Sequence, residues 1–237
     1  MTFSILGRDS DTGDLGIAIA TYSLAVGATC PKILPGIGVV TSQASTNPAI
    51  AEEIMELIED GLEPIESFMQ ALANDEHPEF RQVALLLPLG DALVHSGENI
   101  KPSSGNVNGD NCTAVGNFLD NDNVLSEMVA EFENAADANN AKLPLANRLL
   151  AGLQAGKEAG GQSGANGNHL PERSACLMIG TPGESFPIDL RVDASENAIA
   201  DLRSAYEQYL PMHEFYLNRA EDPTDLPTQD NWLNSSQ

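Results

Sequence analysis

The chain has 237 residues, and its 35 Asp and Glu against 11 Lys and Arg give a formal net charge of −24 at pH 7. This length fits one sizeable domain. Such an excess of negative charge repels phosphate backbones and anionic membrane surfaces, so we expect neither nucleic acid nor a membrane as a partner. The simplest interpretation of the acidic residues is a solvated surface, and the alternative is an acidic docking face.

The first half of the chain predicts four strands followed by two helices. Apolar stretches at 2–9 and 14–23, joined by a turn from Ser10 to Gly13, are typical of a β-hairpin. Two more strands are expected at 25–34 and 36–45, and two helices at 47–61 and 64–74. Asn47 and Pro48 suit the cap and the first position of a helix.

The second half predicts a meander, two helices, a strand pair and a final helix. The expected strands are 81–89, 91–97, 112–119, 174–180 and 186–192, and the expected helices are 123–138, 143–160 and 197–218. Hairpin-joined strands separated by pairs of helices favour antiparallel sheets over βαβ units. The order predicts an α+β fold, a four-layer α-β-β-α sandwich of two antiparallel sheets. We expect a single domain over 1–218 and a loosely held polar tail over 219–237.

The cysteines and the hydropathy pattern indicate a cytoplasmic protein. Cys30, Cys112 and Cys176 are far apart in sequence and odd in number, so we expect three reduced, unpaired thiols. Arg8 and Asp9 interrupt the first apolar run too early for a signal peptide. No apolar stretch approaches the roughly 20 residues of a membrane span.

Three familiar motifs are incomplete. The acids in RDSDTGDLG are spaced like the start of a calcium loop, but the glutamate at position 12 of that loop is missing. GLQAGKE is too short for a phosphate-binding loop, and the four histidines lack metal-ligand spacing. His95, at the end of an apolar strand, is better explained as a structural group than as a catalytic base. We therefore expect no metal and no cofactor.

The chemistry that remains is at the start of the chain. If Met1 is removed, Thr2 carries a hydroxyl and a free α-amine on one residue. Such an amine titrates near pH 7.7 to 8.0, roughly, so a useful fraction is neutral and can accept the hydroxyl proton. This pairing is a known form of activated nucleophile. The alternative is that Thr2 is only the first β-branched residue of a strand, and with Met1 attached the amine is blocked.

An ordered set of short motifs resembles a known family. These are MTFSI and its hairpin, AVGA at 25–28, TSQASTNP at 41–48, RQV at 81–83 with HSG at 95–97, GN at 116–117 and DLRVD at 189–193. Together they resemble domain-of-unknown-function family 1028, over about residues 1–215. That family is grouped with the N-terminal nucleophile hydrolases, which implies the same sandwich fold and a nucleophile at Thr2.

The resemblance also implies roles for three further residues. Lys32 stands at about the depth where a proteasome-like enzyme has a lysine beside the nucleophile, where it would lower the pKa of the amine. Gln43, with Ser42 beside it, stands where a strand leaves the active-site edge, so both are candidates for substrate binding. Helical layers that often pack together in related proteins imply a homodimer or a larger assembly. Asp189 and Arg191 share one face of a predicted strand, and we expect them to form a stabilising ion pair.

Two functions follow from these observations. The first is an N-terminal threonine amidohydrolase that acts on a small amide or acyl-amide through an acyl-enzyme, with an oxyanion hole of backbone N–H groups. The second is a non-catalytic cytoplasmic binding or scaffolding protein on the same fold. Loss of Met1 is required by the first function and irrelevant to the second.

Overall fold

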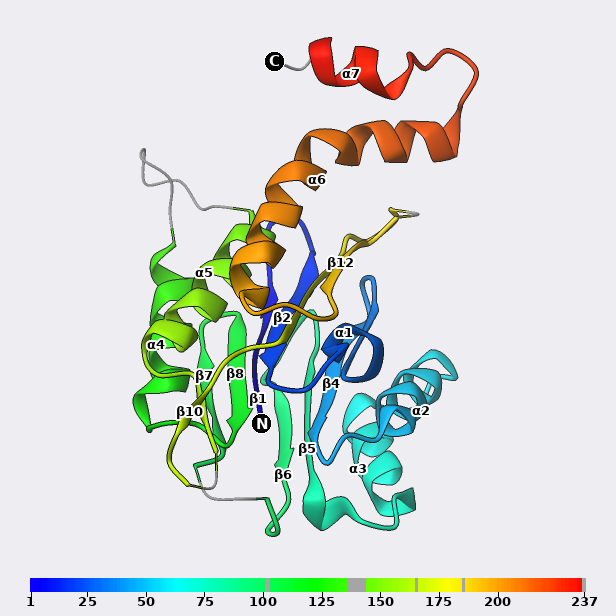
Figure 1. Ribbon diagram of the computed structural model, residues 1–237. Coiled ribbons are helices and arrows are strands. Elements are labelled where there is room, and N and C mark those ends of the chain that lie inside the picture. Colours follow the sequence, from blue (N-terminus) through cyan, green and yellow to red (C-terminus); the bar gives the residue numbers. More distant parts are fainter. Residues whose placement is uncertain (101–102, 136–143, 165, 185, 236–237) are drawn as a thin grey trace.

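The computed structural model describes residues 1–100, 103–135, 144–164, 166–184 and 186–235. Its larger sheet has six strands in the order β12-β11-β2-β1-β8-β7 (Figure 1). These strands are β12 (Ile188–Val192), β11 (Ser174–Gly180), β2 (Leu15–Thr21), β1 (Thr2–Arg8), β8 (Cys112–Asn117) and β7 (Gly105–Gly109). Every strand pair in this sheet is antiparallel, as predicted.

The second sheet has four antiparallel strands in the order β3-β4-β5-β6. They are β3 (Pro31–Leu34), β4 (Gly38–Ala44), β5 (Arg81–Leu86) and β6 (Leu93–Ser96). A short pair, β9 (Gln162–Ser163) and β10 (His169–Leu170), stands apart from both sheets. The fold is therefore α+β with antiparallel sheets.

Helices pack on each sheet, and three apolar clusters fill the molecule. The helices are α1 (Val26–Thr29), α2 (Pro48–Glu59), α3 (Pro64–Asn74), α4 (Asn123–Asn134), α5 (Leu145–Glu158), α6 (Ala198–Glu221), α7 (Gln229–Ser235) and the 3-10 turn η1 (Pro78–Phe80). One cluster joins the six-stranded sheet to α4, α5 and α6. A second, the inter-sheet cluster, has residues of both sheets, and the third joins the four-stranded sheet to α2 and α3.

Strand β1 lies inside its sheet, paired with β2 on one side and β8 on the other. Its side chains alternate between the two faces. Phe3 and Ile5 enter the cluster with α4 and α5, whereas Leu6 enters the inter-sheet cluster. Alternation therefore directs Thr2 and Ser4 toward the four-stranded sheet. A strand buried on both faces explains the nearly continuous apolar run at the start of the sequence.

The predicted strand at 25–34 is wrong in its first part, which is the short helix α1. Ala25 has φ 56° and breaks the extended run, and only Pro31–Leu34 continues as a strand. Gly27 in α1 lies close to β11, since a Cβ there would be 2.9 Å from Cys176 Sγ. The absence of a side chain at Gly27 allows this close approach.

Other elements differ at their edges. The segments 98–111 and 161–172, for which the sequence predicts no helix or strand, contain β7 and the β9–β10 pair, respectively. The expected end of one helix at 136–138 lies outside the described residues. The tail expected to be loose contains α7, in which Trp232 Nε1 donates to the Pro211 carbonyl at 3.0 Å. Among the described helices, none is long and apolar enough to cross a membrane.

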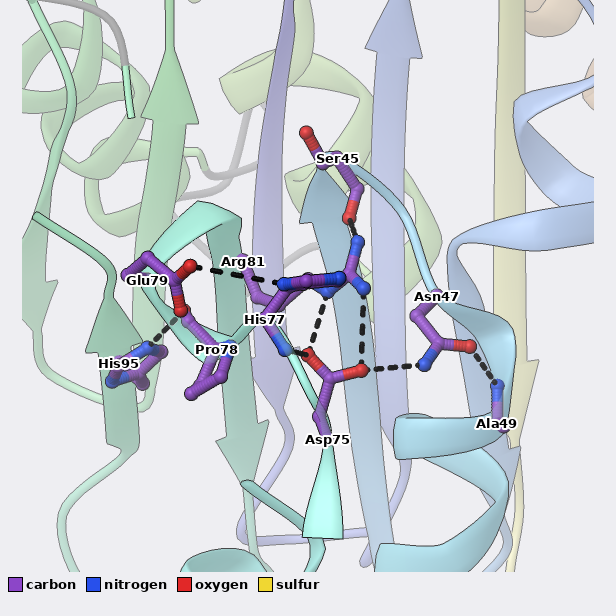
Figure 2. A network of polar contacts seen from close by, with 9 residues as sticks. All are labelled: Ser45, Asn47, Ala49, Asp75, His77, Pro78, Glu79, Arg81 and His95. Atoms are coloured by element: carbon purple, nitrogen blue, oxygen red, sulfur yellow. Dashed lines mark hydrogen bonds and ion pairs between the residues drawn. The ribbon is translucent and has the colours of Figure 1, made fainter. Parts of the chain in front are cut away.

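A polar network ties α2, α3 and β5 together (Figure 2). Asp75, just after α3, accepts from Arg81 Nε at 2.8 Å and from Asn47 Nδ2 at 2.8 Å. Asn47 also caps α2 by accepting from Ala49 N at 3.2 Å. His95 Nε2 donates to the Pro78 carbonyl at 2.8 Å, which agrees with the structural role expected for this histidine.

Stability should depend on the ionisation of Asp75. Hydrogen bonds from Arg81 hold the pKa of Asp75 below its usual value of 3.8. The group therefore stabilises the fold above that value, and the contribution disappears as the pH falls through the lowered folded-state pKa. We expect Asp75→Asn to cost about 1–3 kcal/mol near neutral pH. Urea unfolding from about pH 7 to about pH 3 should show the gap between variant and wild type closing in acid. A constant gap would contradict this.

Candidate functional site

Thr2 begins β1 at the polar end of the space between the two sheets. It pairs with Thr21, the last residue of β2, and with Asn117, the last residue of β8. Leu15, Ile17 and Ile19 of β2 belong to the inter-sheet cluster, so alternation places Thr21 on the same face as Thr2. The Thr2 side chain is buried, with 5% of the residue exposed.

The hydroxyls of Thr2 and Thr21 form a short chain of hydrogen bonds. Their Oγ1 atoms are 3.1 Å apart. Thr21 Oγ1 also donates to the carbonyl oxygen of Met1, which can only accept. Because Thr21 has one hydroxyl proton, the bond between the two threonines is donated by Thr2. Thr21 thus orients the hydroxyl of Thr2 and holds the peptide bond that precedes it.

The α-amine of Met1 and the thiol of Cys30 share this end of the fold. Burial lowers the pKa of the amine below its usual value of 8.0, and the nearby Cys30 raises it by a smaller amount. Burial also raises the pKa of the Cys30 thiol. A thiol with a raised pKa is neutral at pH 7 and is not an activated nucleophile.

Below the threonines lies a network of buried side-chain amides. Gln43 Oε1 accepts from Ser4 Oγ at 3.0 Å, and Gln43 Nε2 donates to Gln82 Oε1 at 2.7 Å. Gln82 Oε1 also accepts from Asn117 Nδ2 at 3.0 Å. Asn117 Oδ1 is buried and has no hydrogen-bond partner among the described residues. The network fixes the side chains around Thr2 and leaves one acceptor open.

The structure brings Gln43 to this end of the fold but not Lys32 or Ser42. On β3, Ile33 packs on the inter-sheet cluster, so its neighbour Lys32 faces α2. Lys32 Nζ lies 3.8 Å from Glu52 Oε1 of that helix. Ser42 shares the face of Val40, which packs with α2 and α3. The four-stranded sheet therefore separates both residues from Thr2.

Sequence reasoning missed the other members of the site. Thr21, Gln82, Asn117 and Ser4 were given no role there, although the predicted hairpin contained the signal for Thr21. The motifs MTFSI, RQV and GN contain the other three. The expected Asp189–Arg191 pair is present, with Arg191 Nη2 2.7 Å from Asp189 Oδ2. The three cysteines are free and buried. Across the part of the chain that the structure describes, no cluster of three or more His, Cys, Asp or Glu could hold a metal ion.

The fold and this site define an α+β protein with two antiparallel sheets and a threonine at the start of an internal strand. Residues 2–202 match the family of unknown function DUF1028, and the chain belongs to that family. The comparison with curated proteins found no match.

Solved structures give three similar chains. The crystal structure of SPO2555 from Silicibacter pomeroyi, a protein of the same family, is 29% identical over 88% of each chain, with a TM-score of 0.76. Anbu (ancestral beta-subunit) from Yersinia bercovieri is 11% identical over 95% of this chain and 98% of its own, with a TM-score of 0.41. An Anbu mutant from Hyphomicrobium sp. strain MC1 is 12% identical over 89% and 95%, with a TM-score of 0.40.

Proposed function

We propose that this protein is an amide hydrolase of the N-terminal nucleophile type, with Thr2 as the nucleophile. The observation that carries the proposal is the position of the Thr2 hydroxyl, at the end of an internal strand and oriented by Thr21 Oγ1 at 3.1 Å. Helices on one face of each sheet support the four-layer α-β-β-α sandwich of those hydrolases. The substrate would be a small amide or acyl-amide.

The mechanism requires cleavage of the bond between Met1 and Thr2. The freed α-amine of Thr2 would then be the base. Burial lowers the pKa of the Met1 amine, and an α-amine at the buried Thr2 would be subject to the same kind of desolvation. Asn117 pairs in register with Thr2, and its Oδ1 has no hydrogen-bond partner among the described residues. This oxygen is an acceptor of the right type for the new amine.

The reaction would take two steps. Thr2 Oγ1 gives its proton to the α-amine and attacks the amide carbon, and the amine product leaves with that proton as the C–N bond breaks. The product of this step is an ester between the acyl group and Thr2. A water molecule then gives a proton to the α-amine and attacks the ester carbon, and the carboxylic acid leaves as Thr2 Oγ1 recovers the proton.

Lys32 is not part of the mechanism that the geometry supports. Its ammonium lies 3.8 Å from Glu52 on the far face of the four-stranded sheet. The lowering of the amine pKa that was expected of Lys32 would have to act through that sheet. In this mechanism, Thr21 and Asn117 are the groups that orient Thr2.

Intact mass spectrometry of protein purified without a fused N-terminal segment tests the first requirement. We expect a mass lower than that of the full sequence by one methionine residue. The same measurement on a Thr2→Leu variant is the control, since a large second residue should keep Met1. Retention of Met1 in the native protein would contradict the proposal. It would favour the alternative, a non-catalytic binding or scaffolding protein on this fold.

A further inference from the structure

A cavity opens beside the candidate site, on the neighbouring strands. It has a volume of about 670 Å³ and is lined by Tyr22, Leu24, Leu170, Pro171, Arg173 and the segment 194–196. This volume is in the range of small-molecule sites, roughly 300–1,000 Å³. The lining combines apolar side chains with one arginine.

The wall of this cavity is continuous with the residues that hold Thr2. Tyr22 directly follows Thr21, and Arg173 N donates to the Thr21 carbonyl at 2.8 Å. Ser174, the next residue, pairs with Thr21 across β11 and β2. Because side chains alternate along a strand, Arg173 and Tyr22 face the side of the sheet opposite to Ser174 and Thr21. A molecule in the cavity would therefore lie at the Thr2 end of the six-stranded sheet, on the other face from the Thr2 hydroxyl.

The backbone of Arg173 is fixed by hydrogen bonds, whereas its charged guanidinium remains available. Its carbonyl accepts from Ser195 N at 2.9 Å, which fixes the residue from the other side of the cavity. The guanidinium carbon lies 5.2 Å from the centre of the Tyr22 ring. Among the hydrogen bonds and ion pairs of the described residues, none involves the Arg173 guanidinium. The guanidinium is therefore available to a ligand in the cavity.

The charges around the cavity limit what it can hold. A guanidinium offers a planar fork of N–H donors that matches a carboxylate. Glu196 lines the same cavity and is exposed, so a second negative charge on the ligand would be repelled. Leu24, Leu170 and Pro171 suit an apolar body. These features together favour a monocarboxylate with an apolar side chain.

We propose that this cavity binds a small monocarboxylate with an apolar body, through Arg173 stacked on Tyr22. This binding is independent of catalysis at Thr2.

Isothermal titration calorimetry with the Thr2→Ala variant tests binding without turnover. The probes are N-acetyl-L-leucine and its uncharged analogue N-acetyl-L-leucinamide, each at two salt concentrations. We expect the carboxylate to bind at least about 10-fold more tightly than the amide, a difference of about 1.4 kcal/mol. Added salt should reduce this preference.

Arg173→Gln should remove the preference, whereas Arg203→Gln, at a different cavity, should keep it. If Arg173→Gln does not fold, Arg173→Lys should retain charge but bind the carboxylate more weakly, because it lacks the fork. Equal affinity for the two probes, no binding of either, or a preference unchanged in Arg173→Gln would overturn the proposal.

Discussion

The Thr2→Ala variant should lose amide turnover by at least about 10³-fold while keeping its fold, because it removes the proposed nucleophile and little else. Alanine at position 2 also permits removal of Met1, so the N-terminus is matched to wild type. A substrate-independent readout is a β-lactone, whose strained ester acylates an activated hydroxyl. Wild type should gain the whole reagent mass on its N-terminal peptide, and Thr2→Ala should not.

Three further variants control this experiment. Thr2→Ser should remain active within about 100-fold, since it keeps a hydroxyl beside the amine. Thr12→Ala, in the exposed turn between β1 and β2, should behave as wild type. Lys32→Ala should also keep its rate and pH optimum, because its ammonium faces α2. Turnover or labelling by Thr2→Ala at the wild-type rate would exclude the mechanism.

Gln82→Leu should lower the free energy of unfolding by about 3 kcal/mol or more. Gln82 is fully buried and links three parts of the fold. Its Oε1 accepts from Gln43 and Asn117, and its Nε2 donates to the Gly116 carbonyl at 2.9 Å. Leucine would fill the space but leave these groups without partners, at about 1–3 kcal/mol for each buried group.

Chemical denaturation of Gln82→Leu should be compared with Gln208→Leu, which makes the same exchange at an exposed position of α6. We expect the control to stay within about 0.5 kcal/mol of wild type. A cost at Gln82 no larger than at Gln208 would show that the amide network contributes little. Because this network surrounds Thr2, any residual folded Gln82→Leu protein should also show weaker β-lactone labelling.

The pairing of Thr2 with Thr21 could have been predicted from the sequence. A turn from Ser10 to Gly13 fixes the register of the hairpin, and counting outward from it places residue 2 opposite residue 21. The strand at the N-terminus, the antiparallel pairing and most helix positions were also accessible, since each depends on local periodicity and turn residues. The family resemblance also pointed to Thr2.

The remainder of the site depends on contacts between distant segments. Gln43, Gln82 and Asn117 come from three strands of two sheets, and no local pattern indicates that their amides meet. The face that Lys32 occupies depends on which side of β3 meets the inter-sheet cluster, and alternation alone cannot decide between the two sides. The position of Lys32 along the chain therefore suggested a contact with Thr2 that the four-stranded sheet prevents.

Two segments also have a structure that their local sequence does not predict. AVGAT has the β-branched and small residues of a strand, but Ala25 with φ 56° and Pro31 confine it to a helical turn. Strand β7, with the sequence GNVNG, has the composition of a loop and is ordered by pairing with β8. In both cases tertiary contacts outweigh local propensity.

The outer part of α6 and the short α7 reach away from the two sheets and carry the C-terminus with them (Figure 1). Trp232 packs against Phe215 in this arm, with ring centres 5.6 Å apart, rather than against either sheet. A purification tag or a surface linker attached at that end would stand clear of Thr2. A segment fused ahead of residue 1 would extend the chain from the end of the space between the sheets. It would also keep the α-amine of Thr2 in a peptide bond.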